Sequence, residues 1–270
     1  MLIEPLAHLP VSLGVFRDYV LAPTDPTVLI RTLLRWGHIV AAITWIGLLY
    51  YFNLVNVNFM KALDAPTKKI VVPALMPPAL WYFRWGALVT VLAGFGYYSM
   101  FILRGDVTNA NAVGAGASYM VVLLVWLIIA CATWAIFNFV LLPNLSKDGR
   151  LLAAATAALA IAMAVAIIWW FDSQLTGMTA GRPDHMASNK TFSIGIGGAL
   201  GIIMLLNVWG VIWPAQKRII AATAAGTPPD AALARRAFLA SRTNAWLSLP
   251  MLFFMGTSHG DWVILGRNAS

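Results

Sequence analysis

Six long apolar runs, separated by short polar stretches, constrain this chain more than any other feature. Each run approaches or exceeds the roughly 20 residues that an α-helix needs to cross a hydrocarbon core. Hydrophobic residues make up 60% of the chain and charged residues only 10%. The sequence therefore predicts an all-α integral membrane protein, a polytopic transmembrane helix bundle of about six spans. The expected spans are 34–57, 79–103, 119–142, 151–171, 192–213 and a weaker 245–265.

The whole chain, residues 1–270, is expected to form a single transmembrane domain. Residues 1–27 contain four prolines around an apolar stretch, and we expect this segment to lie along the membrane surface. Residues 34–265 should form the helix bundle. A loop over 214–244 is expected on the cytoplasmic side, with a short helix near its end that continues toward the last span.

The basic residues are distributed unequally between the two sides of this arrangement. If the N-terminus lies outside, eleven Lys and Arg fall in the inner loops and seven fall outside. Because basic residues are retained on the cytoplasmic side, both termini are predicted outside, in a multi-pass protein of the inner (cytoplasmic) membrane. The excess of 18 Lys and Arg over 10 Asp and Glu then reflects orientation in the lipid bilayer, and nucleic acid is not an expected partner.

His38 lies inside the first apolar run, one helical turn after the polar and aromatic edge formed by Arg35 and Trp36. An ionisable side chain in hydrocarbon is costly, so it usually faces the protein interior and has a function there. Neutral imidazole can hold iron or copper without bringing a charge into the membrane. Trp45 lies two turns further along on the same helix face. We therefore predict a cofactor ligand at His38, with Trp45 beside the cofactor.

His259 occurs 14 residues into the last expected span, which places it about 21 Å into a core about 30 Å thick. His38 also falls in the outer half of the bilayer. Two imidazoles at matching depth on different helices are what axial ligation of a b-type haem requires. We therefore predict haem b as the cofactor and His38 and His259 as the metal ligands. His185, in the outer loop 172–190, is the alternative second ligand, although a solvated loop residue is the simpler interpretation.

A stripe of small residues, Ser193, Gly197 and Gly201, repeats at every fourth position of the fifth run. Such a stripe lets another helix, or a flat macrocycle, approach the backbone closely. Gly197 and Gly201 are therefore candidate cofactor-binding residues. Helix packing is the simpler interpretation, because this pattern is common in membrane helices.

Three motifs in fixed order carry a resemblance to a known family. They are Arg35 to His38 with Trp45 to Gly47, then Asn207 to Arg218, and then Ser241 to Pro250 with Ser258 and His259. Together they resemble the membrane domain of the membrane-bound urate hydroxylase family (PuuD type). The resemblance implies an integral membrane oxidoreductase that hydroxylates urate and passes electrons to a cytochrome c, which in that family is usually a fused C-terminal domain.

The sequence departs from that family in having one cysteine, Cys131, and no Cys-x-x-Cys-His motif for covalent haem attachment. The fused cytochrome is therefore expected to be absent, and any cytochrome c partner should be a separate protein. A second departure lies next to His259, which Gly260 and Asp261 follow in this chain.

Three classes of function remain open. The first is a haem-binding oxidoreductase or electron-transfer protein of the urate hydroxylase type, and the second is a non-catalytic membrane subunit of a larger respiratory or photosynthetic complex. The third, a transporter, is disfavoured because the spans lack paired intramembrane charges. No catalytic residue is predicted. Urate is a planar anion, and the polar side chains available near the inner side are Asn53, Arg84, Asn138 and Asn207.

Overall fold

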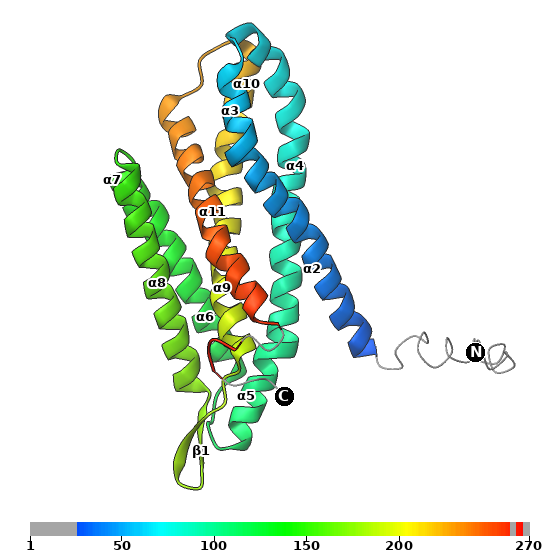
Figure 1. Cartoon of the computed structure of the whole chain (residues 1–270), viewed down its shortest axis with the longest axis vertical. Helices are drawn as coiled ribbons and strands as arrows, with labels where there is room; N and C mark the ends of the chain where they lie inside the picture. Colours follow the sequence, from blue (N-terminus) through cyan, green and yellow to red (C-terminus); the bar gives the residue numbers. More distant parts are fainter. Residues whose placement is uncertain (1–25, 260–262, 267–270) are drawn as a thin grey trace, which may run out of the picture.

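The computed structural model describes residues 26–259 and 263–266, and within them six long helices form an elongated bundle (Figure 1). This confirms the predicted all-α membrane fold. The predicted interfacial segment 1–27 lies outside the described residues, except that Pro26 and Thr27 begin the first helix. The six helices cover Pro26–Ala62, Ala65–Ala112, Tyr119–Leu145, Gly149–Gln174, Asn189–Ala225 and Ala231–Thr257.

Four of these helices contain a π-helical turn, which divides each of them into two labelled parts. π-Helical turns are rare and often mark functional sites. The first helix comprises α2 (Pro26–Tyr50), the π turn Tyr51–Asn56 and α3 (Val57–Ala62), and the second comprises α4 (Ala65–Tyr97), Tyr98–Leu103 and α5 (Arg104–Ala112). The third comprises α6 (Tyr119–Ile136), Phe137–Leu141 and α7 (Leu142–Leu145). The fifth comprises α9 (Asn189–Asn207), Val208–Ile212 and α10 (Trp213–Ala225), while α8 (Gly149–Gln174) and α11 (Ala231–Thr257) are uninterrupted.

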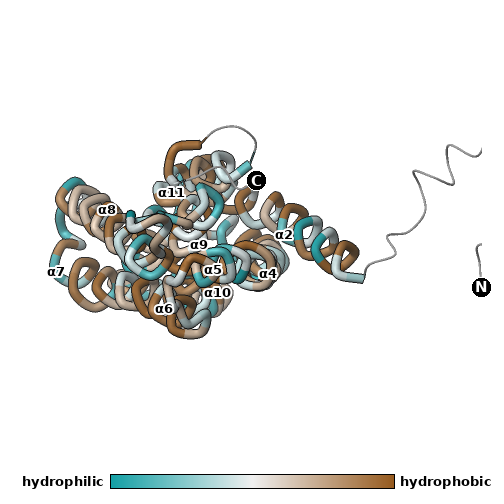
Figure 2. Tube along the Cα trace, turned by 90° about the horizontal axis from the view of Figure 1, so that it is seen from below, coloured by the Kyte–Doolittle hydropathy of each residue, from teal (hydrophilic) through white to brown (hydrophobic). Residues whose placement is uncertain are grey.

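Five of the six helices are long and apolar enough to cross a membrane. The sixth, α11, has 27 residues but carries Arg235, Arg236 and Arg242 in its first half, which makes it less apolar than the others. Figure 2, a view along the bundle, shows hydrophobic residues along the peripheral helices α2, α6 and α8. Lipid would cover these outward faces.

The predicted loop 214–244 is shorter than expected, although the short helix expected near its end is present as the first part of α11. The fifth helix continues to Ala225 and α11 already begins at Ala231, so the connection is only residues 226–230. Gly226, with a φ of 74°, ends α10 in the left-handed conformation that glycine adopts without strain. The carboxylate of Asp230 accepts hydrogen bonds from the backbone N–H groups of Ala232 and Leu233 and so caps α11.

The predicted last span, 245–265, is also displaced, because α11 starts fourteen residues earlier and ends at Thr257. Pro250 lies inside this helix without ending it. The beginning of α2 and the end of α11 lie at the same end of the bundle (Figure 1), as an even number of passes requires. At that end the predicted loop 172–190 contains an antiparallel hairpin of β1 (Thr176–Thr179) and β2 (Arg182–His185).

α9 is the central helix of the bundle and is buried along most of its length. It contacts α4, α6, α8 and α11, while α2 packs mainly on α4. Glycine and alanine occupy many of its positions, so neighbouring helices approach its backbone closely. This packing leaves a space where α2, α4, α6, α9 and α11 face one another.

Candidate functional site

A cavity of about 420 Å³ lies between α2, α4, α6, α9 and α11. Small-molecule and cofactor sites typically have volumes of roughly 300–1,000 Å³ and mostly apolar walls with a few polar groups. This cavity has the same character, because apolar side chains form most of its lining. The polar side chains that reach it include Arg35, His38, Tyr97, Ser258 and His259.

His38 is half-buried on α2, and its ring is held by the backbone of α4. Its Nδ1 lies 2.8 Å from the carbonyl oxygen of Thr90, so Nδ1–H donates to that carbonyl and Nε2 carries the free lone pair. Gly94, one turn further along α4, leaves the space that the ring occupies, since a Cβ atom there would lie 2.6 Å from Nδ1. A metal-binding histidine is commonly oriented in this way, by a hydrogen bond from its other nitrogen to a carbonyl.

His259 lines the same cavity. It was predicted to lie on the last spanning helix, but in the structure it lies just beyond the end of α11. It follows Ser258, the residue that caps the end of α11. Its Nδ1 lies 3.1 Å from the carbonyl oxygen of Met255 and 2.9 Å from the hydroxyl oxygen of Ser258. When Nδ1 carries the proton and donates to Met255, Nε2 is left as a free acceptor, as in His38. The structure therefore brings the two predicted ligands to one cavity from opposite ends of the sequence.

Aromatic rings form part of the cavity wall. Trp45, predicted to lie beside the cofactor, lines the cavity with 1% of its surface exposed, and its indole N–H has no hydrogen-bond partner among the described residues. Trp126 stacks almost parallel on Phe95, with an angle of 8° between the rings. Its indole N–H donates to the carbonyl oxygen of Gly195, which fixes the ring. Trp126 and Phe95 therefore present parallel apolar rings to the cavity, and α9 holds Trp126 in place.

The two predicted glycines differ in their surroundings. Gly201 lines the cavity, with Met251 as its nearest neighbour across the helix contact. Gly197 packs against α11, where an added Cβ would lie 3.2 Å from the carbonyl oxygen of Met251. Gly197 therefore serves the close approach of α9 and α11, and Gly198 takes the corresponding place in the cavity wall.

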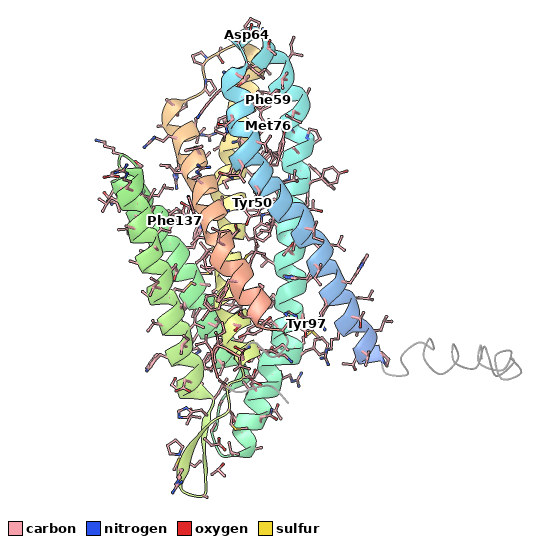
Figure 3. The ribbon with its side chains drawn as sticks, in the orientation of Figure 1. Tyr50, Phe59, Asp64, Met76, Tyr97 and Phe137 are labelled. Carbon is pink, nitrogen blue, oxygen red and sulfur yellow. The ribbon has the colours of Figure 1, made fainter. Side chains whose placement is uncertain are left out.

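Arg35 and Tyr97 form the edge of the cavity nearest the start of α2. The Cζ atom of Arg35 lies 5.6 Å from the centre of the Tyr97 ring. Figure 3 shows Tyr97 on α4 beside the lower part of α2, with Tyr50 higher in the bundle. There the hydroxyl of Tyr50 lies 2.9 Å from that of Ser248 on α11. The edge with Arg35 is thus a charged boundary of an otherwise apolar space.

His185, the alternative second ligand, belongs to a different part of the structure. It lies on β2, with Nδ1 2.8 Å from a carboxylate oxygen of Asp172 and 3.0 Å from the hydroxyl of Thr176. It is exposed and is absent from the cavity lining. Among the described residues, no group of three or more His, Cys, Asp or Glu side chains is placed to hold a metal ion.

Two of the asparagines that were candidates for urate contacts, Asn138 and Asn207, form a hydrogen bond with each other. Oδ1 of Asn207 accepts hydrogen bonds from Nε1 of Trp134 at 3.0 Å and from Nδ2 of Asn138 at 2.9 Å. Nδ2 of Asn207 donates to Oδ1 of Asn244 at 2.8 Å. All three asparagines are buried, so this network joins α6, α9 and α11 across the bundle. Asn53 is similarly engaged, with Nδ2 donating to the backbone of Leu49 and to Ser241 on α11.

The model of a family described as "Urate oxidase N-terminal" matches residues 63–268. No curated protein and no solved structure shows a significant match to the chain. The matched region contains Gly94, Gly201 and His259, whereas His38 and Trp45 precede it.

Proposed function

The chain belongs to the urate oxidase N-terminal family, and we propose that it is a membrane oxidoreductase of the urate hydroxylase type that binds a b-type haem. In this proposal it passes electrons to a separate cytochrome. One observation carries the proposal: His38 and His259 line the same cavity, and each has Nδ1 within hydrogen-bond distance of a main-chain carbonyl. Two imidazoles that line one largely apolar cavity, each oriented by a main-chain carbonyl, are the donor set that axial haem ligation uses.

The residues present fit a haem better than a bare metal ion. Two histidines cannot complete the coordination of an ion alone, and no third His, Cys, Asp or Glu joins them among the described residues. A tetrapyrrole supplies its own equatorial nitrogens, so the protein needs to add only axial ligands. The apolar walls formed by Trp45, Trp126 and Phe95 suit a flat, largely apolar macrocycle.

Each of these side chains has a role that the geometry supports. The carbonyl of Thr90 holds the His38 ring in one orientation and one tautomer. This hydrogen bond also raises the basicity of Nε2, which makes its lone pair a better metal ligand. Ser258 and the Met255 carbonyl act on His259 in the same way. Trp45, Phe95 and Trp126 make their part of the cavity wall apolar. When bound, the haem supplies one-electron chemistry.

The substrate assignment rests on the family. We propose urate as the electron donor and a cytochrome c as the acceptor, in an inner-membrane protein whose two termini face outward. No residue is assigned as catalytic.

A non-catalytic subunit of a larger complex is the second candidate. One observation favours it: the first half of α2 diverges from the bundle (Figure 1) and exposes large apolar side chains such as Leu29 and Leu33, on which either lipid or a partner helix would pack.

The decisive experiment is a reduced-minus-oxidised absorption spectrum of the purified protein, followed by addition of urate with oxidised cytochrome c as acceptor. A b-type signal together with urate-dependent reduction of cytochrome c supports the full proposal. A b-type signal without any response to urate favours the subunit. Absence of a b-type signal after reconstitution with haem contradicts haem binding, whether the protein is an oxidoreductase or a subunit. The variant His185→Ala is the matched control, because that histidine lies outside the cavity.

A further inference from the structure

Two basic side chains share one aromatic ring at a place separate from the cavity. The guanidinium carbon of Arg84, on α4, lies 3.8 Å from the centre of the Trp213 ring. The ammonium nitrogen of Lys217, on α10, lies 5.4 Å from the centre of the same ring. Arg84 also lies 5.8 Å from the ring of Trp209. We call Arg84, Trp209, Trp213 and Lys217 the Arg84 cluster.

The fold holds this cluster in place. Nε1 of Trp209 donates a hydrogen bond to the backbone carbonyl of Arg84 at 3.2 Å, which joins α4 to the π-helical turn before α10. The ring of Trp209 packs edge-to-face on Trp85, with centres 5.4 Å apart. Trp213 begins α10 directly after that π turn, and Lys217 follows one turn later. The charges are therefore set between two helices by packing.

The cluster has positive charge without a matching negative charge. In the described part of the chain, no carboxylate forms an ion pair with Arg84 or Lys217. A cation over an indole ring is stabilised by the ring quadrupole, but two cations beside one ring repel each other. The Nε atom of Arg84 is buried and has no hydrogen-bond partner there, which leaves a desolvated donor of a charged group unsatisfied. An anion bound between the two cations would relieve both costs.

The surroundings indicate where that anion comes from. Trp81, Tyr82 and Trp85 lie on α4 beside Arg84 and expose 50%, 58% and 40% of their surfaces. Exposed Trp and Tyr side chains mark the boundary between membrane and water. Basic pockets between transmembrane helices at this level bind anionic lipid head groups. We propose that the Arg84 cluster binds the phosphate group of an anionic phospholipid. The site is independent of the cavity and of any haem.

Lipid retention measured by native mass spectrometry tests this site. The protein, solubilised in neutral detergent, is mixed with equal amounts of phosphatidylglycerol and phosphatidylcholine. The lipid that stays bound is identified from the mass that it adds to the protein. The wild type should retain phosphatidylglycerol preferentially. Lys217→Gln and Arg84→Gln should each lower that preference about fivefold, the effect of one basic residue near an anionic membrane surface. Arg218→Gln, at an exposed neighbour with the same change of charge, should leave it unchanged.

A competition arm separates the two sources of phosphate. Millimolar inorganic phosphate should fail to displace phosphatidylglycerol, because the lipid tails contribute to binding. Displacement that depends on Lys217 would show that the site binds free phosphate and would overturn the proposal that its ligand is a phospholipid. Lys217 is exposed, so its variant should fold even if Arg84→Gln does not. Equal retention of the two lipids by the wild type overturns the proposal. Lys217→Gln and Arg218→Gln variants that behave alike would overturn it as well.

Discussion

The imidazole of His38 occupies the space that a side chain at Gly94 would fill. A Cβ atom on Gly94 would lie 2.6 Å from Nδ1 of His38 and 2.8 Å from its Cε1, closer than non-bonded atoms approach. The ring can therefore reach the carbonyl of Thr90 on the preceding turn only because residue 94 has no side chain. α4 thus orients the predicted ligand of α2 through its backbone alone.

Gly94→Ala should lower haem retention at least tenfold. The added methyl group would push the ring away from Thr90, and overpacking of this kind typically costs about 1–3 kcal/mol. Gly96→Ala is the matched control, since its Cβ would meet only Leu34, at an ordinary distance of 3.6 Å. Haem content per protein, measured by the pyridine haemochrome assay, decides between them. Equal haem content in the two variants would show that the position of the His38 ring is irrelevant to binding.

His38→Ala should remove most of the bound haem while leaving membrane insertion intact. No other cavity-lining residue of α2 or α4 offers an imidazole, so that side of the cavity would lose its ligand, and the substitution makes α2 more apolar, which favours insertion. The measurements are the haem-to-protein ratio of the purified variant and its amount in the membrane fraction. A variant that is present in the membrane with an unchanged haem ratio would refute the assignment of His38 as a ligand.

Much of the fold is readable from the sequence because lipid imposes a simple rule. Backbone groups in hydrocarbon must be paired internally, so long apolar runs become helices. Five of the six predicted spans correspond to helices that are long and apolar enough to cross a membrane. The error in the loop 214–244 has the same origin, because hydropathy locates the apolar part of a helix and not its ends. α10 is a helix whose polar residues hide it from that criterion, whereas the first half of α11 was recognised by its helix-forming composition.

The site was less predictable, and the reasons are physical. His38 was recognisable because a histidine in an apolar run is costly. The Thr90 carbonyl that orients it is a backbone group, which leaves no mark in the sequence. The depth argument for His259 assumed a helix that in fact ends at Thr257. Asn138 and Asn207 drew attention as isolated polar residues, but whether such residues bind a ligand or one another depends on which helices pair, and the sequence of one helix does not give that.

Exchange of His259 for methionine distinguishes the two candidates for the second axial ligand. If His259 is axial, His259→Met should retain haem with a raised reduction potential, because Met/His ligation shifts the iron in that direction. His185→Ala should leave the spectrum unchanged, since His185 is held by Asp172 outside the cavity. Redox titration followed by absorption spectroscopy measures both. A lost low-spin spectrum in His185→Ala with a normal potential in His259→Met would identify the hairpin histidine as the ligand.

Reporter fusions at Ser146 and Thr227 should both report a cytoplasmic location. The two positions lie in the α7–α8 and α10–α11 connections, and the positive-inside rule places the end of the bundle richer in Lys and Arg on the cytoplasmic side. A fusion at Thr179, in the hairpin at the other end, is the matched control and should report the opposite side. A periplasmic signal at Ser146 or Thr227 would reverse the proposed orientation and the side on which a cytochrome docks.

Arg35→Gln should accelerate haem loss about two- to fivefold, the range expected for one partly exposed ion pair. Arg35 lines the edge of the cavity one turn before His38, where it can meet the propionate carboxylates of a haem. The dimethyl ester of haem, which lacks those charges, should be lost at the same rate from the wild type and from the variant. Arg31→Gln is the control, because Arg31 is exposed and does not line the cavity. Transfer of haem to apomyoglobin measures each rate. If the dimethyl ester is also lost faster from Arg35→Gln, Arg35 acts through the shape of the cavity edge and not through its charge. If the variant loses neither haem nor the dimethyl ester faster, the haem propionates do not contact Arg35.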